Sequence, residues 1–596
     1  MSSSSSDQWL YVAAPLFAYG LASLGLAAWG WGEGAGRGHP VAGFFRAISW
    51  SLRRLTGLPG WSMAGALTGL TAAGIAAVGL YWDVAWHIDL GRDDELFTPS
   101  HTMILIGLNG LVFAAAIAVL FANLDRGGRG RLRVPWSALV LGALGIGASA
   151  AFPLDDLWHR AYGVDVTLWS PTHLQLIAGG ALSPIAVWLM IREGRRDPNG
   201  PAEREGRDAS TEPSGPTALG RAIEVLSFGA ILTGLSIVQG EFDFGVPQFQ
   251  VLYQPILIAA AAGLGLVAAR IALGRGGALL AVMGFLTLRA IFALLVAGAL
   301  NHTVPRFPLY LVAALAVEAV AFGLGTERRA RFAVTAGAGV ATVGMGAELA
   351  WIQVSGWGLP TTNGLPAALA LSLAAGTTAA VLGAALVGGA APSSHRLRPL
   401  AVAGAGLGLV LVLAVPLPRD VGAVEAVIGL DRLDGEARVT VQLEPPTAAE
   451  DASVFGLIAW QGGGRVLANL DRVGPGRYVS SRPIPVSGTW KSMVGLQRGR
   501  EVMAAPIYLP ADPEIGASAV PAQAERRVAF SRNTDILLRE AKDGPAWPAL
   551  LSYAGVAIVV AMWLGLFTRA TARVQPPSLP GGGLPRRTPA SVGAEP

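Results

Sequence analysis

Cysteine is absent from this chain of 596 residues, and only 14% of the residues are charged. The absence of thiols excludes disulfides, thiolate metal sites, iron–sulfur clusters and covalently attached haem. Histidine, carboxylate and methionine side chains therefore remain as ligands for a metal. Soluble domains carry roughly 25% charged residues. Together with 52% hydrophobic residues, the low charge predicts an integral membrane protein that lies in a lipid bilayer.

An extended basic surface is also missing, since the net charge is only +4 and the arginines are concentrated in a few connecting segments. Such clusters indicate the cytoplasmic loops of a membrane protein and give no support for nucleic-acid binding. Apolar segments of about 20 residues are long enough to cross a hydrocarbon core of ~30 Å. We predict thirteen such spans, near residues 9–31, 62–83, 99–122, 135–154, 171–191, 219–240, 252–271, 276–300, 307–325, 331–354, 365–389, 398–416 and 546–567.

The charges of the connections predict the orientation. Arginine clusters follow the odd-numbered spans, whereas the alternate connections are acidic or neutral. By the positive-inside rule, this pattern predicts a protein of the bacterial plasma membrane with an extracytoplasmic N-terminus and a cytoplasmic C-terminus.

The composition changes between residues 419 and 543, where runs such as 437–445 and 454–460 alternate apolar and polar residues between Gly, Pro and Asp turns. This pattern predicts a small β-sandwich. Because the segment lies between the twelfth and thirteenth predicted spans, we expect it to be extracytoplasmic. It contains no histidine, so we interpret it as a docking or capping module rather than a metal-binding domain.

The sequence therefore predicts an all-α polytopic membrane protein, built from repeated helical hairpins, with an extracytoplasmic all-β domain. Two segments rich in Pro and Gly are expected to be disordered, because they have little apolar surface to bury. The predicted regions are 1–61, the first span and an interfacial helix; 62–192, two duplicated helical hairpins; 193–218, a disordered cytoplasmic linker; 219–418, further spans; 419–543, the β-sandwich; 544–570, the last span; and 571–596, a disordered cytoplasmic tail.

The chain is organised around a repeat, because the segment 81–107 recurs 72 residues later. Both copies contain the pattern Asp-x3-His-x13-His, and four of the seven histidines of the chain occupy equivalent places in it. This duplication predicts two related metal sites. The equivalent ligand candidates are Asp83 and Asp155, His87 and His159, and His101 and His173.

Each copy has the sequence of a helical hairpin. Asp83 and His87 are four residues apart, so they share one face of a helix. His101 follows a Thr-Pro-Ser sequence, in which Pro can open a helix and Ser or Thr can cap it. A closed hairpin brings His101 level with His87, and we therefore predict that two imidazoles and one carboxylate converge in each repeat.

Two other interpretations compete with the metal sites. A haem bound by two histidines would require histidines that face each other from separate helices near the middle of the membrane, without a nearby carboxylate. Histidines and acids at a membrane boundary are also often only solvated. The repeated spacing favours metal binding over both. Imidazole suits copper, zinc, iron and nickel, and two histidines with one carboxylate also match non-haem iron, so the ligand types do not identify the metal.

Further polar residues are predicted to support these sites or to have structural roles. We expect accessory roles, such as ordering loops or orienting ligands, for Asp89, Asp93, Asp156, Asp165 and His302. Arg289 and Glu318 lie near the middle of two neighbouring predicted spans, where an unpaired charge is costly. We predict that they form an ion pair between the helices. The residue pattern identifies no catalytic residue.

The segment 83–105, DVAWHIDLGRDDELFTPSHTMIL, resembles the C subunit of particulate methane and ammonia monooxygenases, the copper membrane monooxygenase family. In that family an Asp-x3-His-x12-His pattern ending in Phe-Thr-Pro-Ser-His supplies a membrane copper site, and a neighbouring site uses Asn-x3-His-x13-His. Asp83, His87 and His101 match the first set of ligands in type and order, with one additional residue between the histidines. Asp155 stands where the second set has Asn.

The resemblance extends over roughly residues 62–191. It implies copper as the cofactor, with iron or zinc as alternatives, and oxidation of a small apolar substrate or ammonia with dioxygen. It also implies partner subunits, one of them with a histidine copper site that the β domain cannot reproduce, and a homo-oligomer is left open. The alternatives are a protein that accepts, stores or transfers copper without turnover, and a scaffold subunit of a larger complex.

Overall fold

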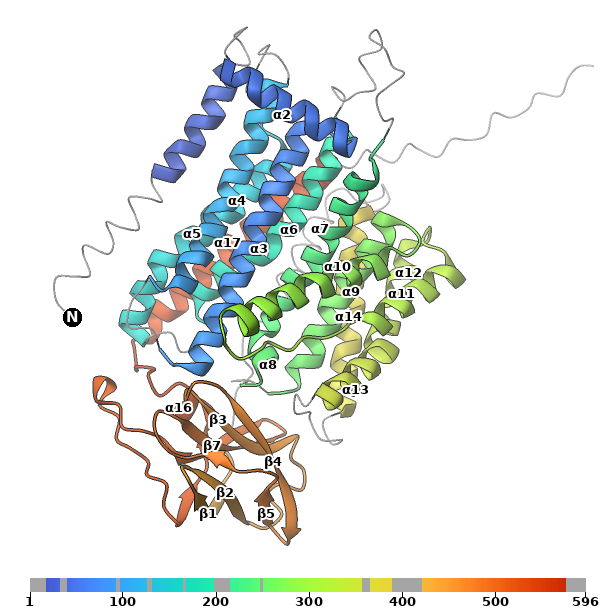
Figure 1. Cartoon of the computed structure of the whole chain (residues 1–596). Helices are drawn as coiled ribbons and strands as arrows, with labels where there is room; N and C mark the ends of the chain where they lie inside the picture. Colours follow the sequence, from blue (N-terminus) through green and yellow to red (C-terminus); the bar gives the residue numbers. More distant parts are fainter. Residues whose placement is uncertain are drawn as a thin grey trace, which may run out of the picture.

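The computed structural model describes residues 18–32, 40–92, 97–125, 131–163, 168–197, 215–246, 250–355, 365–388 and 421–574. It contains a bundle of long helices with an antiparallel β domain at one end (Figure 1). Ten helices within the described residues are long and apolar enough to cross a membrane. The predicted fold class, a polytopic α-helical membrane protein with an all-β domain, is confirmed.

Four helices form the part of the bundle that carries the repeat. They pack as two hairpins, α3 with α4 and α5 with α6, and the hairpins contact each other through α4 with α5 and α3 with α6. Small residues let the helices of each hairpin approach closely, since a Cβ added to Gly107 or to its equivalent Gly179 would collide with the partner helix. The bounds are α3 Gly60–Asp89, α4 Pro99–Leu124, α5 Trp136–Tyr162 and α6 Pro171–Arg195.

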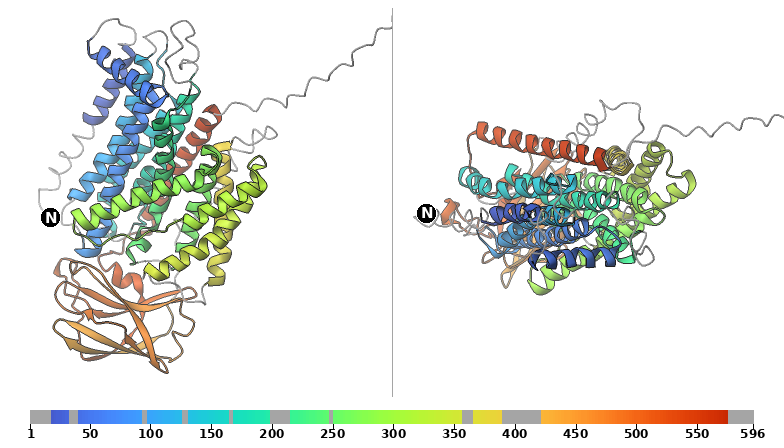
Figure 2. Two further views of the ribbon diagram at one scale, coloured as in Figure 1. Left: turned by 45° about the vertical axis from the view of Figure 1, so that its right-hand side comes forward. Right: turned by 90° about the horizontal axis from the view of Figure 1, so that it is seen from above.

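The other helices surround this unit and extend it on one side. Helix α2 packs on α3 and α4 at the end away from the β domain, and α17 packs along α5 and α6 (Figure 1 and Figure 2). Helices α9 to α14 form a second group, joined to the first through α7. The bounds are α2 Pro40–Thr56, α7 Ala218–Ser236, η2 Ile237–Gln239, α8 Gly240–Phe244, α9 Tyr253–Leu273, α10 Gly277–Leu294, η3 Leu295–Ala299, α11 Leu311–Leu324, α12 Arg329–Gly339, η4 Val340–Gly344, α13 Met345–Ser355, α14 Leu365–Gly388 and α17 Ala546–Val574.

Within the described residues, ten of the thirteen predicted spans are found as helices long enough to cross a membrane. In the region of the first predicted span, residues 18–32 are helical, and the predicted span 398–416 lies outside the described residues. Residues 301–310 are not helical, so α11 has only 14 residues and a length of about 21 Å, too short to cross the core alone. Most of the predicted linker, 198–214, and residues 575–596 of the predicted tail also lie outside the described part.

The β domain is a single antiparallel sheet that folds over its own core. Val439 and Val441 on β2 are buried in the same cluster as Val494 and Leu496 on β7, four positions away in the sheet order. The predicted strands near 437–445 and 454–460 are confirmed. The strand order is β10 (Ser531–Arg532), β8 (Glu501–Tyr508), β7 (Lys491–Arg498), β3 (Val454–Trp460), β4 (Val466–Gly474), β5 (Arg477–Ser480), β2 (Glu436–Glu444), β1 (Glu425–Leu433) and β9 (Glu525–Ala529), with β6 (Ile484–Pro485) paired to β2.

Candidate metal centre

The first repeat brings its three predicted ligands together. Asp83 and His87 lie one turn apart near the end of α3, and His101 lies in the first turn of α4. The Nε2 atom of His101 is 3.1 Å from Oδ1 of Asp83, and Nε2 of His87 is 3.7 Å from Oδ2. All three ligand atoms lie within 4.8 Å of one another, so a single ion can contact all of them.

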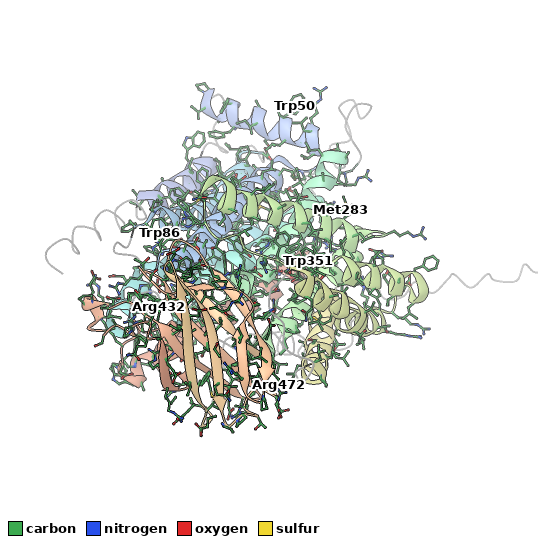
Figure 3. All side chains as sticks on the ribbon, turned by 60° about the horizontal axis from the view of Figure 1, so that its bottom comes forward. Trp50, Trp86, Met283, Trp351, Arg432 and Arg472 are labelled. Atoms are coloured by element: carbon green, nitrogen blue, oxygen red, sulfur yellow. The ribbon has the colours of Figure 1, made fainter. Side chains whose placement is uncertain are left out.

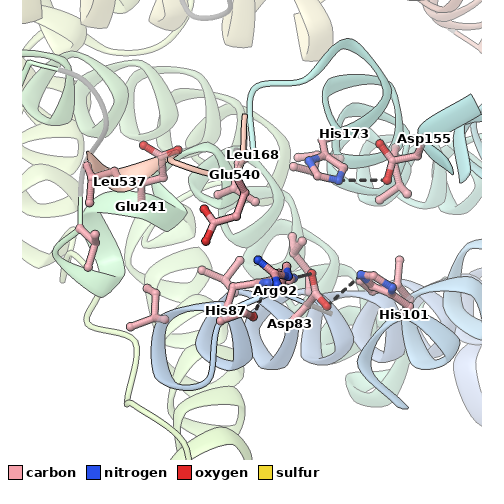
Figure 4. Close-up of a pocket in the computed structure, with 18 of the residues that line it drawn as sticks. Asp83, His87, Arg92, His101, Asp155, Leu168, His173, Glu241, Leu537 and Glu540 are labelled. Carbon is pink, nitrogen blue, oxygen red and sulfur yellow. Dashed lines mark hydrogen bonds and ion pairs between the residues drawn. The ribbon is translucent and has the colours of Figure 1, made fainter. Parts of the chain in front are cut away.

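The second repeat has the same geometry. Asp155 and His159 lie on the last turns of α5, and His173 lies in the first turn of α6. The Nε2 atoms of His173 and His159 are 3.1 and 3.6 Å from Oδ2 of Asp155. These three ligand atoms also lie within 4.8 Å of one another. Asp83, His101, Asp155 and His173 are seen around one pocket in Figure 4.

The short Thr-Pro-Ser sequence before His101 shapes the first set of ligands, which we call the first triad. Thr98 caps α4 by accepting a hydrogen bond from the His101 backbone N–H, and Pro99 opens the helix. The hydroxyl of Ser100 donates to Oδ1 of Asp83 at 2.8 Å. The sequence that starts the second helix therefore also orients the carboxylate on the first.

The second set, the second triad, exchanges the two hydroxyl residues. Ser170 caps α6 by accepting from the His173 backbone N–H, and Thr172 donates to Oδ1 of Asp155. Thr98 and Ser170 thus share one role, and Ser100 and Thr172 the other. Both hydroxyl types can cap a helix and donate to a carboxylate, which explains why the exchange leaves the geometry unchanged.

A glycine after α3 orients His87. Nδ1 of His87 lies 2.9 Å from the carbonyl oxygen of Gly91, whose φ of 108° favours glycine. Nδ1 can donate to this carbonyl only in the tautomer that leaves a lone pair on Nε2, the atom directed at Asp83. The equivalent Gly163 has the same φ of 108°. The Gly91 carbonyl thus favours the tautomer of His87 in which Nε2 could coordinate a metal.

Asp89 and His302, two of the residues predicted to have accessory roles, bond to groups outside the two triads. Asp89 accepts hydrogen bonds from the backbone N–H of Thr303 at 2.7 Å and pairs with Nδ1 of His302 at 3.1 Å. His302 also contacts the ring of Trp86, which lies at the junction of the helices and the β domain (Figure 3). Asp89 and His302 thus connect α3 to the segment 301–310.

Of the other accessory candidates, only Asp156 lies within the described residues. Asp156 forms an ion pair with Arg160 at 2.6 Å, one turn along α5. Asp93 and Asp165 lie outside the described residues.

The predicted ion pair between Arg289 and Glu318 is wrong. Arg289 pairs with Asp243 at 2.6 Å, and Glu318 pairs with Arg270 at 2.8 Å. The Glu318 carboxylate also accepts hydrogen bonds from backbone N–H groups at the start of α10, including that of Ala278. Arg289 lies about three turns further along the same helix, roughly 17 Å away at 1.5 Å per residue. The two side chains therefore lie at different depths.

Both triads open onto one cavity of about 140 Å³. Among the apolar side chains that line it, four lie three residues from a ligand and further from the β domain, so they form an apolar floor one helical turn below the triads. They repeat with the same offset of 72 as the ligands, and this periodicity is the signal by which they could have been found from the sequence. They are Leu80, Ile104, Phe152 and Leu176.

The β domain and α8 complete the walls of the cavity. Glu540 presents its carboxylate over the triads (Figure 4) and pairs with Lys491 at 2.8 Å. Glu241, on the short helix α8, lies on another side of the cavity. Sequence reasoning did not identify these residues, because they are distant in the chain from the repeat. The β-domain residues in the wall are Trp460, Gln461, Leu537 and Glu540.

The β domain caps the helix that carries Asp83 and His87. The last four carbonyl groups of a helix have no partner within it. On α3 the carbonyl of His87 accepts from the side chain of Gln461 at 3.2 Å, that of Ile88 from the Gln461 backbone at 2.9 Å, and that of Asp89 from Gly463 at 2.9 Å. The end of α5 is held similarly, since the backbone N–H of Lys542 donates to the carbonyl of Tyr162 at 2.8 Å.

An ion pair beside the cavity fastens the same junction. Arg92 lines the cavity and contacts Asp512 of the β domain at 2.6 Å and also Glu514. The hydrogen bond from Arg92 holds the pKa of Asp512 below its usual range. The predicted capping role of the β domain agrees with these contacts.

Replacing Gln461 by alanine is expected to weaken metal binding at the first triad by roughly tenfold, the lower end of the range for groups that orient metal ligands. The side chain of Gln461 holds the backbone of His87, and no such contact to the second triad is present among the described residues. Binding would be measured by competition with a chromophoric chelator, in the His159→Ala/His173→Ala background, which isolates the first triad.

The matched control is Gln442→Ala, which removes a glutamine amide that bonds to a carbonyl within the β domain. Equal binding by the Gln461 and Gln442 variants would contradict a positioning role for Gln461.

The geometry can hold two ions in one enclosed space, each by two imidazoles and a carboxylate, above an apolar floor. This donor set fits copper, iron or zinc and leaves open coordination positions towards the cavity. Comparison of the chain with protein-family models, with curated proteins and with solved structures found no match.

Proposed function

We propose that this protein binds copper at the two triads and oxidises a small apolar molecule, or ammonia, with dioxygen. The observation that supports the proposal is the shared cavity, in which two Asp-His-His sets lie directly above the apolar floor. A small apolar molecule would be held by the floor through burial of its surface. Copper, when bound, would supply the binding and reduction of dioxygen.

Copper is favoured over iron and zinc by the resemblance of segment 83–105 to the copper membrane monooxygenases. The structure of the first repeat supports this choice of ligands, because Asp83, His87 and His101 are the residues that match that pattern, and they converge. Among the described residues no cysteine or methionine lies in either triad. The donor set is therefore nitrogen and oxygen, which suits Cu(II) better than Cu(I).

The chain's own residues have separable roles in this proposal. Ser100 and Thr172 hold the two ligand carboxylates in place. The β domain closes the cavity at the end opposite the apolar floor and excludes bulk water from the reacting groups. Glu241 and Glu540 place two further carboxylates in the cavity wall, where they can accept or donate protons during turnover.

We also propose that the triads and the β domain face the outside of a bacterial plasma membrane. The arginines paired at the other end of the four-helix unit support this orientation, since Arg133 contacts Asp197 and Arg195 contacts Glu224 there. Positive charge is enriched on the cytoplasmic side of membrane proteins.

A second candidate is a protein that accepts, stores or transfers copper without turnover. The two triads are the clusters of three or more His, Asp or Glu found within the described residues, and binding of copper without turnover would need only these residues. An oxidase would also need an electron donor.

Dioxygen consumption distinguishes the two candidates. Copper-loaded protein in lipid nanodiscs, supplied with a quinol as reductant and propene as substrate, is expected to consume dioxygen and form the epoxide. The His87→Ala/His101→Ala/His159→Ala/His173→Ala variant is the matched control. If the loaded protein with both sites filled shows no uptake above this control with propene, ethene or ammonia, the oxidase proposal is wrong and copper handling is favoured.

A further inference from the structure

Three arginines from distant parts of the chain meet at the end of α8. Arg289 comes from α10, Arg306 from the segment 301–310, and Arg465 from the connection between β3 and β4. The Arg289 guanidinium contacts the Asp243 carboxylate at 2.6 Å and the carbonyl of Arg306 at 3.2 Å. The backbone N–H of Arg306 donates to the carbonyl of Asp243 at 2.9 Å.

Arg465 reaches the same place from the β domain. Its Nη1 atom packs directly over Gly245, two residues after Asp243, and a Cβ at that position would collide with it. The φ of Gly245 is 70°, which also favours glycine. The absence of a side chain at Gly245 thus gives the Arg465 guanidinium room beside α8.

Several N–H donors of these arginines have no acceptor in the described structure. They are buried, and they comprise Nε and Nη1 of Arg289, Nη1 of Arg306, and Nε and Nη1 of Arg465. Arg289 is 1% exposed. Its guanidinium lies over the rings of Tyr81 and Phe307, at 4.2 and 5.1 Å from the centroids. Those contacts engage the faces of the guanidinium plane and leave its edge donors available.

Two acids, Asp243 and Asp89, lie close to these arginines. Asp243 contributes one carboxylate oxygen to Arg289, and Asp89 bonds to His302 and Thr303. The pKa of Arg465 is lowered to about 10, mainly by burial and secondly by the positive charge of Arg306. Two like charges thus lie close enough to repel each other. Buried donors without acceptors and like charges in proximity are both costly, and an anion between them would relieve both costs.

We propose that Arg289, Arg306 and Arg465 form a binding site for a phosphate-type oxyanion, either the phosphodiester of a lipid headgroup or inorganic phosphate. Planar guanidinium groups donate two parallel hydrogen bonds to such an anion, and a tetrahedral oxyanion offers enough acceptors for the donors of three arginines. The site lies where the helices meet the β domain, which is where headgroups would lie. It does not depend on the metal proposal, and no residue of the triads takes part in it.

The expected consequence of anion binding is a fixed position for α8. This short helix carries Asp243 and Gly245 at the arginine site and Glu241 at the cavity of the triads. The anion would therefore connect the β domain, the segment 301–310 and one wall of the cavity.

Titration of the full-length, delipidated protein in a neutral detergent tests the site with two probes, inorganic phosphate and short-chain phosphatidylglycerol. We expect one equivalent of at least one probe to bind by isothermal titration calorimetry. Arg306→Gln and Arg465→Gln should each weaken its binding at least tenfold. Preference for phosphatidylglycerol would identify a lipid headgroup, and preference for phosphate would identify a free anion.

The matched control is Arg432→Gln, which changes an exposed arginine on β1 of the β domain (labelled in Figure 3). Arg289 is left unchanged, because its loss would also break the ion pair with Asp243. Size-exclusion profiles and thermal unfolding establish that each variant is folded. If folded wild-type protein binds neither probe, or if the Arg306 and Arg465 variants bind as tightly as the Arg432 variant, the proposal is overturned.

Discussion

Replacing His87 and His101 together by alanine is expected to remove one of two bound copper ions and to leave the other in place. Each triad has its own carboxylate and its own hairpin, and the ligand atoms within each set lie within 4.8 Å of one another. Losing both imidazoles leaves only Asp83, and one carboxylate cannot retain copper against a chelator. The reciprocal change, His159→Ala/His173→Ala, should remove the other ion. Copper per chain, measured by mass spectrometry after dialysis, checks both.

The control for this experiment is His302→Ala, which removes a histidine of the same region that bonds to Asp89 rather than to a triad. It should keep both ions. Retention of both ions by either double variant would contradict the assignment of the ligands. Loss of both ions from each double variant would instead show that the two sites bind as one unit.

Replacing Arg289 by leucine is expected to destabilise the protein by about 3–5 kcal/mol, the usual cost of removing one partner of a buried ion pair. Arg289 and Asp243 are each 1% exposed at the side chain, so the remaining carboxylate would stay buried without its cation. Leucine also removes the contact of the guanidinium with the ring of Tyr81. The measurement is the midpoint of thermal unfolding in detergent, followed by light scattering.

A double variant separates the pair from simple loss of packing. Arg289→Leu/Asp243→Leu removes both charges, and it should recover most of the lost stability, because replacing a buried pair by apolar residues is often close to neutral. A double variant as unstable as Arg289→Leu would show that packing around Arg289, and not the ion pair, determines the stability of this region.

The two triads could be predicted from the sequence because their geometry is local. A spacing of four places Asp83 and His87 on one helix face, and the Thr-Pro-Ser sequence determines where the helix of His101 begins. The same pattern occurs in both copies of the repeat, so each copy supports the interpretation of the other as a set of metal ligands. The apolar floor obeys the same rule, since Leu80 and Phe152 are also 72 residues apart.

The rest of the site depends on contacts between segments that are distant in the chain. Local sequence patterns do not predict such contacts. Gln461 lies 374 residues from His87, whose carbonyl it binds. The partner of Arg289 was predicted wrongly because helical continuity was assumed through residues 307–310, which are not helical. That segment and α8 bring Asp243 to Arg289, and they leave Glu318 at the other end of the neighbouring helix.

The β domain contributes to the candidate site in a way that its amino-acid composition did not predict. Without histidine it offers no ligand of that type, yet it supplies the cap of α3 and the carboxylate of Glu540 in the cavity wall. A domain without histidine can thus be expected to influence how tightly a neighbouring site would retain a metal, because it contacts the helix ends that carry the candidate ligands.

The metal content of the wild-type protein tests the central claim most directly. Protein purified from cells grown with copper, iron and zinc, and dialysed against a weak chelator, should contain close to two copper ions per chain, one for each triad. Electron paramagnetic resonance should then show Cu(II) with nitrogen ligands. Protein that binds no metal even after copper loading, or that retains only iron or zinc in competition with copper, would contradict the account.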